Sequence, residues 1–267
     1  MPDLYLTNTF KIHYLDKNPS GKQIVLLLHG LGANGSSWRL QIPALVQAGF
    51  RVIAPDARGF GKSGFPANNI SIATMAKDFA ILIQSFHVKP VHVVGISMGG
   101  THALQLVLDN PDLIKSLVLV NTFASLQPKK VSLWIYYGIR LFLLHTMGIP
   151  TQAKFVAKKI FPRQEQEFER QELIKQIMQA NPSAYRAVMR SFANFNLVSR
   201  LNEIKTPTLV ITAEQDDTVS PENQKILAEK IVGARQIFVA NSGHAVIVDQ
   251  PELFNRILLD FLKSDRF

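Results

Sequence analysis

The strongest chemical signal in the sequence is a serine flanked by glycines two positions away, Gly95-x-Ser97-x-Gly99. It follows a β-branched apolar run, residues 91–96, and precedes apolar residues at helical spacing. A turn this sharp strains the serine backbone and requires neighbours without a Cβ. The pattern predicts Ser97 as a nucleophile above a sheet, with the Met98 N–H, at a helix N-terminus, aimed at a developing oxyanion.

A serine hydroxyl needs a base, and the sequence offers seven histidines. His244 lies in the loop directly after the last predicted strand. It should therefore lie at the carboxyl end of the sheet, near Ser97. Other histidines fall within expected strands or helices, and His29 begins a glycine-rich loop. Position therefore favours His244 as the general base.

The base needs an orienting acid, and three aspartates follow predicted strands. Asp56 precedes a glycine-rich loop, where a bond that holds the loop is the better interpretation. Asn121 occupies the end of the strand after the serine, so no acid is available there. Asp216 and Asp217 remain as alternatives, and either produces the chain order Ser, Asp, His.

Short apolar runs alternate with helical patterns on both sides of these residues, which predicts a mostly parallel sheet covered by helices on both faces. The eight expected strands lie near residues 4–6, 11–15, 24–28, 51–54, 91–96, 116–120, 205–212 and 236–240.

The alternation stops between the sixth and seventh strands. Residues 123–202 show only helical patterns, so we expect a helical lid inserted into a core made of residues 1–122 and 203–267. Both ends of the insertion lie at the carboxyl edge of the sheet, where ligands bind in open parallel sheets.

These features together resemble the α/β-hydrolase fold family, in its lid-bearing serine esterase and lipase-like branch. The matching stretches are His29-Gly30-Leu31-Gly32, Asp56-Ala57-Arg58-Gly59-Phe60-Gly61-Lys62-Ser63, Gly95-Ile96-Ser97-Met98-Gly99-Gly100, Glu214-Gln215-Asp216 and Gly243-His244-Ala245.

The resemblance implies a catalytic triad with Ser97 as nucleophile and His244 as base. It also implies the Leu31 N–H as the second oxyanion donor, and its usual Gly-x-x-Asp spacing favours Asp216 over Asp217, although Ala213 replaces the glycine. Related dehalogenases and epoxide hydrolases carry Asp at the nucleophile position, so Ser97 argues against both activities.

Composition narrows the classes of protein further. The chain has 267 residues and no cysteine, which excludes disulfides, cysteine-ligated metals and a cysteine nucleophile. The sequence contains no motif for a metal or an organic cofactor, and no nucleic-acid recognition motif accompanies its net charge of +9. No signal peptide or membrane span is recognisable, so a cytoplasmic location is expected.

Basic residues are concentrated in the expected lid. Residues 125–200 contain twelve Lys or Arg and four Glu, which accounts for nearly all of the net charge. The apolar stretch at residues 131–144 could line an acyl pocket, pack on the core with a solvated basic face outside, or rest weakly on an anionic lipid surface.

The function that these observations favour is hydrolysis of carboxylic esters with apolar acyl groups or of other small-molecule esters, through an acyl-enzyme. Two alternatives remain open, because fold and triad do not determine the reaction. One is other chemistry on the same triad, namely that of a thioesterase, a carbon–carbon bond hydrolase or a lyase. The other is a non-catalytic ligand-binding protein.

Overall fold

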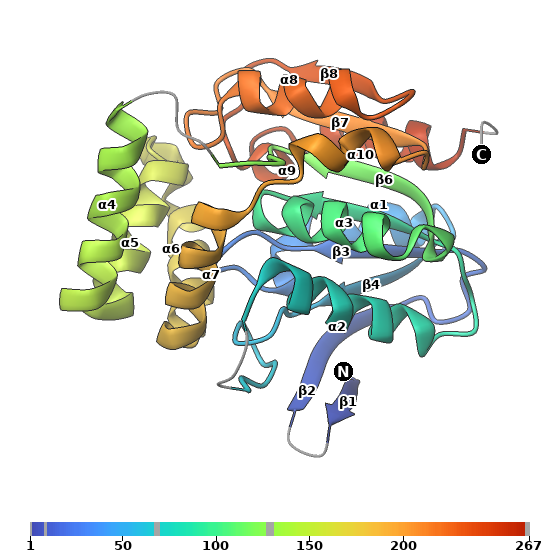
Figure 1. Cartoon of the computed structure of the whole chain (residues 1–267), viewed down its shortest axis with the longest axis horizontal. Coiled ribbons are helices and arrows are strands. Elements are labelled where there is room, and N and C mark those ends of the chain that lie inside the picture. Colours follow the sequence, from blue (N-terminus) through green and yellow to red (C-terminus); the bar gives the residue numbers. More distant parts are fainter. Residues whose placement is uncertain (1, 8–9, 67–69, 127–130, 265–267) are drawn as a thin grey trace.

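An eight-stranded sheet forms the centre of the computed structural model, which describes residues 2–7, 10–66, 70–126 and 131–264 (Figure 1). The strand order is β1-β2-β4-β3-β5-β6-β7-β8; β1 and β2 are antiparallel to their neighbours and the other pairs are parallel. The predicted fold class is therefore confirmed. The strands are β1 (Asp3–Thr7), β2 (Phe10–Lys17), β3 (Ile24–Leu28), β4 (Arg51–Pro55), β5 (Val91–Ile96), β6 (Ile114–Val120), β7 (Thr208–Ala213) and β8 (Arg235–Val239).

Helices cover both faces of the sheet, because successive strand residues point to opposite sides. In β3, Leu26 enters the core that α2 and α3 complete, whereas Leu27 enters the core that α1 and α10 complete. The covering helices are α2 (Ile72–Gln84), α3 (Met98–Asp109) and α8 (Pro221–Lys230) on one face, and α1 (Ile42–Gln47), α9 (Val246–Asp249) and α10 (Pro251–Leu262) on the other. The sequence pattern did not predict α1.

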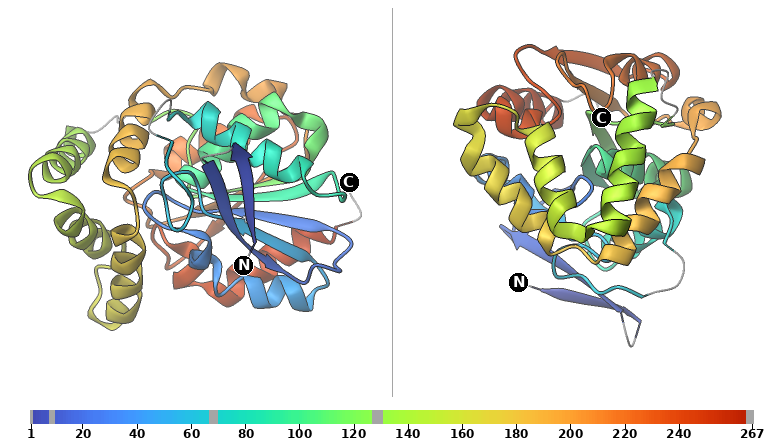
Figure 2. Two further views of the ribbon diagram at one scale, coloured as in Figure 1. Left: turned by 90° about the horizontal axis from the view of Figure 1, so that it is seen from below. Right: turned by 90° about the vertical axis from the view of Figure 1, so that its left-hand side faces the viewer.

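In the part of the chain that the structure describes, four α-helices lie between β6 and β7, beyond one end of the sheet (Figures 1 and 2). We refer to them as the lid: α4 (Val131–Thr146), α5 (Gly148–Ile160), α6 (Glu167–Met178) and α7 (Pro182–Asn194). Lys129 and Lys130, which were counted in the basic lid, lie outside the described residues. Within the described part of the chain, no helix is long and apolar enough to cross a membrane.

Candidate active site

Ser97 occupies a strained turn between β5 and α3. Its backbone angles, φ 53° and ψ −118°, lie outside the regions that non-glycine residues usually adopt. A Cβ at Gly95 would collide with the Gly99 backbone, and one at Gly99 would collide with the Leu28 carbonyl. Only glycine therefore fits at both flanking positions, which is the geometry expected of a nucleophile turn.

The peptide N–H groups of Met98 and Leu31 are held in fixed directions. Each belongs to a peptide whose carbonyl, of Ser97 or of Gly30, accepts hydrogen bonds. The Ser97 carbonyl accepts from Gly100 N at 3.0 Å and from Thr122 Oγ1 at 2.6 Å. Because a trans peptide places its C=O and N–H on opposite sides, these bonds direct the Met98 N–H the other way. The Gly30 carbonyl is held likewise by Ala33 N at 3.1 Å, which directs the Leu31 N–H.

His29 helps to hold the Gly30–Leu31 peptide, and its ring contacts do not suit a general base for Ser97. Its Nδ1 lies 2.8 Å from the Gly30 carbonyl, and its Nε2 accepts from Ala57 N at 2.9 Å. Since a backbone N–H can only donate, the ring is the neutral tautomer with its proton on Nδ1. Burial lowers the pKa of His29, which also favours the neutral form.

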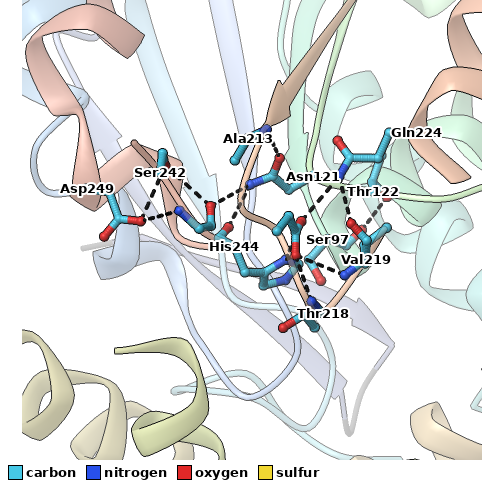
Figure 3. A network of polar contacts seen from close by, with 12 residues as sticks. Ser97, Asn121, Thr122, Ala213, Thr218, Val219, Gln224, Ser242, His244 and Asp249 are labelled. Atoms are coloured by element: carbon cyan, nitrogen blue, oxygen red, sulfur yellow. Dashed lines mark hydrogen bonds and ion pairs between the residues drawn. The ribbon is translucent and has the colours of Figure 1, made fainter. Parts of the chain in front are cut away.

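Asp216 lies in the loop that follows β7, and His244, which is labelled in Figure 3, lies in the loop that follows β8. His244 Nδ1 lies 2.9 Å from Asp216 Oδ2, and the Asp216 carboxylate is fully buried. The same carboxylate accepts from Thr218 N and Val219 N, each at 2.9 Å, and from Gln224 Nε2 at 3.2 Å. These donors fix the carboxylate in position beside His244.

The structure shows which of the three candidate aspartates contacts His244. The Asp217 side chain points outward, is 64% exposed and pairs with Lys159 of the lid. Asp56 accepts from Gly35 N and Lys62 N, both at 2.8 Å, so it holds the loop as expected from sequence. Of the three, Asp216 contacts His244.

Sequence analysis missed a positioning role for Asn121. Its Nδ2 donates to the Gly243 and His244 carbonyls at 3.2 and 2.9 Å, and its Oδ1 accepts from Ala213 N at 2.9 Å (Figure 3). Asn121 therefore ties β6 to the loops that carry both Asp216 and His244. The signal in the sequence was its place at the carboxyl end of a buried strand, where its side chain can reach the loops that follow neighbouring strands.

Asp249 provides a second support, which sequence analysis also missed. Its Oδ2 accepts from Gly243 N at 2.9 Å, and its Oδ1 accepts from Gln166 Nε2 of the lid region at 3.0 Å. The loop before His244 is thus bonded to both the core and the lid region.

Ser97 and His244 line one cavity of about 130 Å³ beneath the lid. Leu31 lines its core side, while Leu173 and Arg140 reach it from the lid. Among the described residues, no three His, Asp or Glu side chains are grouped as a metal site would require. The cavity therefore brings together a serine, a histidine bonded to a buried aspartate, and two oriented N–H groups.

Known proteins share this architecture. A family model described as alpha/beta hydrolase fold matches residues 23–251. Relatives called putative carbamate hydrolase RutD include one from Variovorax paradoxus, 33% identical over 94% of this chain and 96% of that protein, and one from Caulobacter vibrioides, 33% identical over 95% and 96%.

Similar solved structures include an esterase from Exiguobacterium antarcticum, with a TM-score of 0.88, 26% identity and coverage of 96% of both chains. The enol-lactonase from Burkholderia xenovorans has a TM-score of 0.88 at 25% identity and covers 98% of this chain and 100% of its own. Because the family model spans most of the sequence, the chain belongs to the α/β-hydrolase fold family.

Proposed function

We propose that this hydrolase cleaves carboxylic esters of small molecules through a covalent acyl-enzyme on Ser97. The observation that carries the proposal is the bond from His244 Nδ1 to the buried Asp216 carboxylate, in a cavity that Ser97 also lines. This bond orients the imidazole with Nε2 turned away from Asp216, where it can act as a base.

In the proposed reaction, His244 Nε2 removes the Ser97 proton as Oγ attacks the substrate carbonyl carbon. Asp216 stabilises the imidazolium that forms, and the N–H groups of Leu31 and Met98 bind the tetrahedral oxyanion. The carbon–oxygen bond to the leaving group breaks, and His244 returns the proton to that oxygen. Water, deprotonated by His244, then attacks the acyl carbon. The bond from this carbon to Ser97 Oγ breaks, His244 returns the proton to Oγ, and the acid is released.

The size of the cavity supports small substrates. A volume of about 130 Å³ is close to the roughly 150 Å³ of an engineered protein cavity that binds benzene. Short acyl groups therefore fit better than the long chains of a lipase substrate.

Carbamate cleavage is the second candidate. The relatives named putative carbamate hydrolase are 33% identical across nearly the whole chain. A carbamate ester presents a carbonyl carbon to the same nucleophile and oxyanion donors, so the site requires no rearrangement to attack it.

The test is hydrolysis of 4-nitrophenyl acetate, butyrate and palmitate and of a 4-nitrophenyl carbamate, by wild type and Ser97→Ala. We expect wild type to prefer the short esters and Ser97→Ala to lose at least about 10⁴-fold in kcat. A fluorophosphonate should label wild type at Ser97, as read by peptide mass. Folded wild type that neither turns over any of these compounds nor takes the label would overturn the proposal.

A further inference from the structure

Helix α4 of the lid buries an arginine together with the apolar Leu144, and it exposes other apolar side chains. Its residues Val131, Ile135 and Phe142 recur on one face and are exposed, whereas Arg140 on the opposite face is only 6% exposed. Arginine is rarely buried without a specific role, because removing its charge from water is costly. Burial of Arg140 therefore requires polar partners inside the molecule.

Neutral groups of neighbouring lid helices hold the Arg140 guanidinium in position. Arg140 Nη2 donates to Tyr185 Oη at 2.6 Å. With the buried Gln152 amide turned so that its oxygen faces Arg140, that oxygen accepts from Nε at 2.9 Å. These acceptors orient the planar guanidinium and carry no charge themselves.

The same contacts connect Arg140 to the oxyanion loop. The Tyr185 ring packs against Gly32, where an added Cβ would lie 3.0 Å from the ring. Arg140 also lines the cavity that Ser97 and His244 line. A substrate whose carbonyl is bound at Ser97 would therefore lie in the cavity whose wall contains the Arg140 charge.

The acidic side chains in the cavity wall contribute little repulsion to an anion. Glu169 pairs with Arg39 at 2.5 Å, and Glu172 pairs with Lys175 at 2.6 Å. Each negative charge thus has a cation beside it.

We propose that Arg140 forms a subsite for a carboxylate on the substrate, so that the preferred substrates are small esters that carry an acid group. A guanidinium suits this role because its planar donors match the two oxygens of a carboxylate. The inference rests on the proposed function, since it places the carboxylate on the ester that Ser97 attacks.

The test compares substrates of equal shape and different charge. Mono-(4-nitrophenyl) succinate carries a carboxylate where 4-nitrophenyl 4-methylpentanoate carries an isopropyl group of similar shape. A second pair, 4-acetoxybenzoate and 4-nitrophenyl acetate, places the acid on the leaving group. We expect wild type to have the lower KM for the anionic member of at least one pair.

Arg140→Met should raise the KM for that anionic ester about 10- to 100-fold and leave its neutral counterpart nearly unchanged, because only the charged hydrogen bonds are lost. Arg140→Lys should restore part of the preference. Arg190→Met, at an exposed position on α7, is the matched control and should change the KM for neither the anionic nor the neutral ester. Tyr185→Phe removes the acceptor that orients Arg140 and should cause a smaller loss for the anionic ester, which keeps the test usable if Arg140→Met unfolds.

Equal losses on anionic and neutral esters in Arg140→Met, or no anionic preference of wild type in either pair, would overturn the subsite. Calorimetric binding of succinate to Ser97→Ala separates this from failure of the proposed function. Succinate binding that Arg140→Met abolishes, in a protein that hydrolyses no ester, would retain the subsite and reject the esterase. Ester turnover without a preference for anionic esters and without succinate binding would retain the esterase proposal and reject the subsite.

Discussion

The core side and the lid side of the cavity differ in what positions their residues. On the core side, backbone groups and buried polar side chains hold each residue: Ser97 lies in a strained turn, and Asp216 accepts two backbone N–H bonds. On the lid side, Arg140 is held by side chains of neighbouring helices, Tyr185 and Gln152.

This difference separates the proposed reaction from the proposed substrate preference. Groups fixed by backbone bonds keep the accurate geometry that proton transfer and oxyanion binding require. Arg140 makes none of these backbone bonds, so its replacement should leave that geometry in place. Core substitutions should therefore change kcat for every substrate, and lid substitutions should change which substrate is preferred.

The largest expected effect on the core side comes from Asp216, and its neighbour Asp217 is the control. Asp216→Asn should lower kcat about 10⁴-fold, because the amide no longer stabilises the imidazolium or its tautomer. Asp217→Asn removes an exposed pair with Lys159 and should change kcat less than twofold. Steady-state kinetics on 4-nitrophenyl butyrate measures both, and a larger loss in Asp217→Asn would reverse the assignment.

Asn121→Ala should have an intermediate effect. It leaves the buried Ala213 N–H and His244 carbonyl without their partner, at about 1–3 kcal/mol each, and loosens the loops of the acid and the base. We expect kcat to fall about 10- to 100-fold and the melting temperature to drop.

Asn202→Ala, at an exposed position, is the control and should change neither quantity. If Asn121→Ala lowers the melting temperature but keeps full kcat at a temperature where it is folded, the residue supports the fold only.

The smallest expected effect concerns the outer surface of the lid, where lipid association is still a prediction from sequence. Residues 131–164 contain no Asp or Glu, and the exposed face of α4 adjoins α5, which exposes Lys154 and Lys158. We expect weak binding to vesicles containing phosphatidylglycerol and less to phosphatidylcholine alone.

Lys154→Glu/Lys158→Glu should weaken vesicle co-sedimentation at least tenfold, since each basic residue near such a surface contributes about 1 kcal/mol. Lys225→Glu/Lys230→Glu, on α8, is the matched control and should leave vesicle co-sedimentation unchanged. Equal binding to both vesicle types would contradict the prediction, and esterase kinetics on soluble substrates should be unaffected.

Much of the fold could be predicted because its signals are local. The run Ile24–Leu28 is a strand buried on both faces. Serine is a preferred residue just before a helix, and Ser71 caps α2 by accepting from Thr74 N at 3.1 Å. Helix α1 was missed because it is six residues long, too short for a helical period to stand out.

The sequence by itself determined the strands, the strained serine turn and the expectation that His244 would lie near Ser97. These follow from β-branched runs, from glycines that a sharp turn requires, and from the rule that parallel strands end at one edge. Such signals lie within a few residues of one another, so they can be recognised without knowledge of distant contacts.

Only the tertiary structure decided which aspartate faces His244, what Asn121 holds and where the Arg140 charge points. Asn121 and His244 are 123 residues apart, and Arg140 and Tyr185 are 45 apart. In the sequence, Arg140 is only a charge interrupting an apolar helix. Its place in the wall of the cavity that Ser97 also lines depends on which face of α4 packs inward. That face is determined by neighbouring helices and the core rather than by the helix itself.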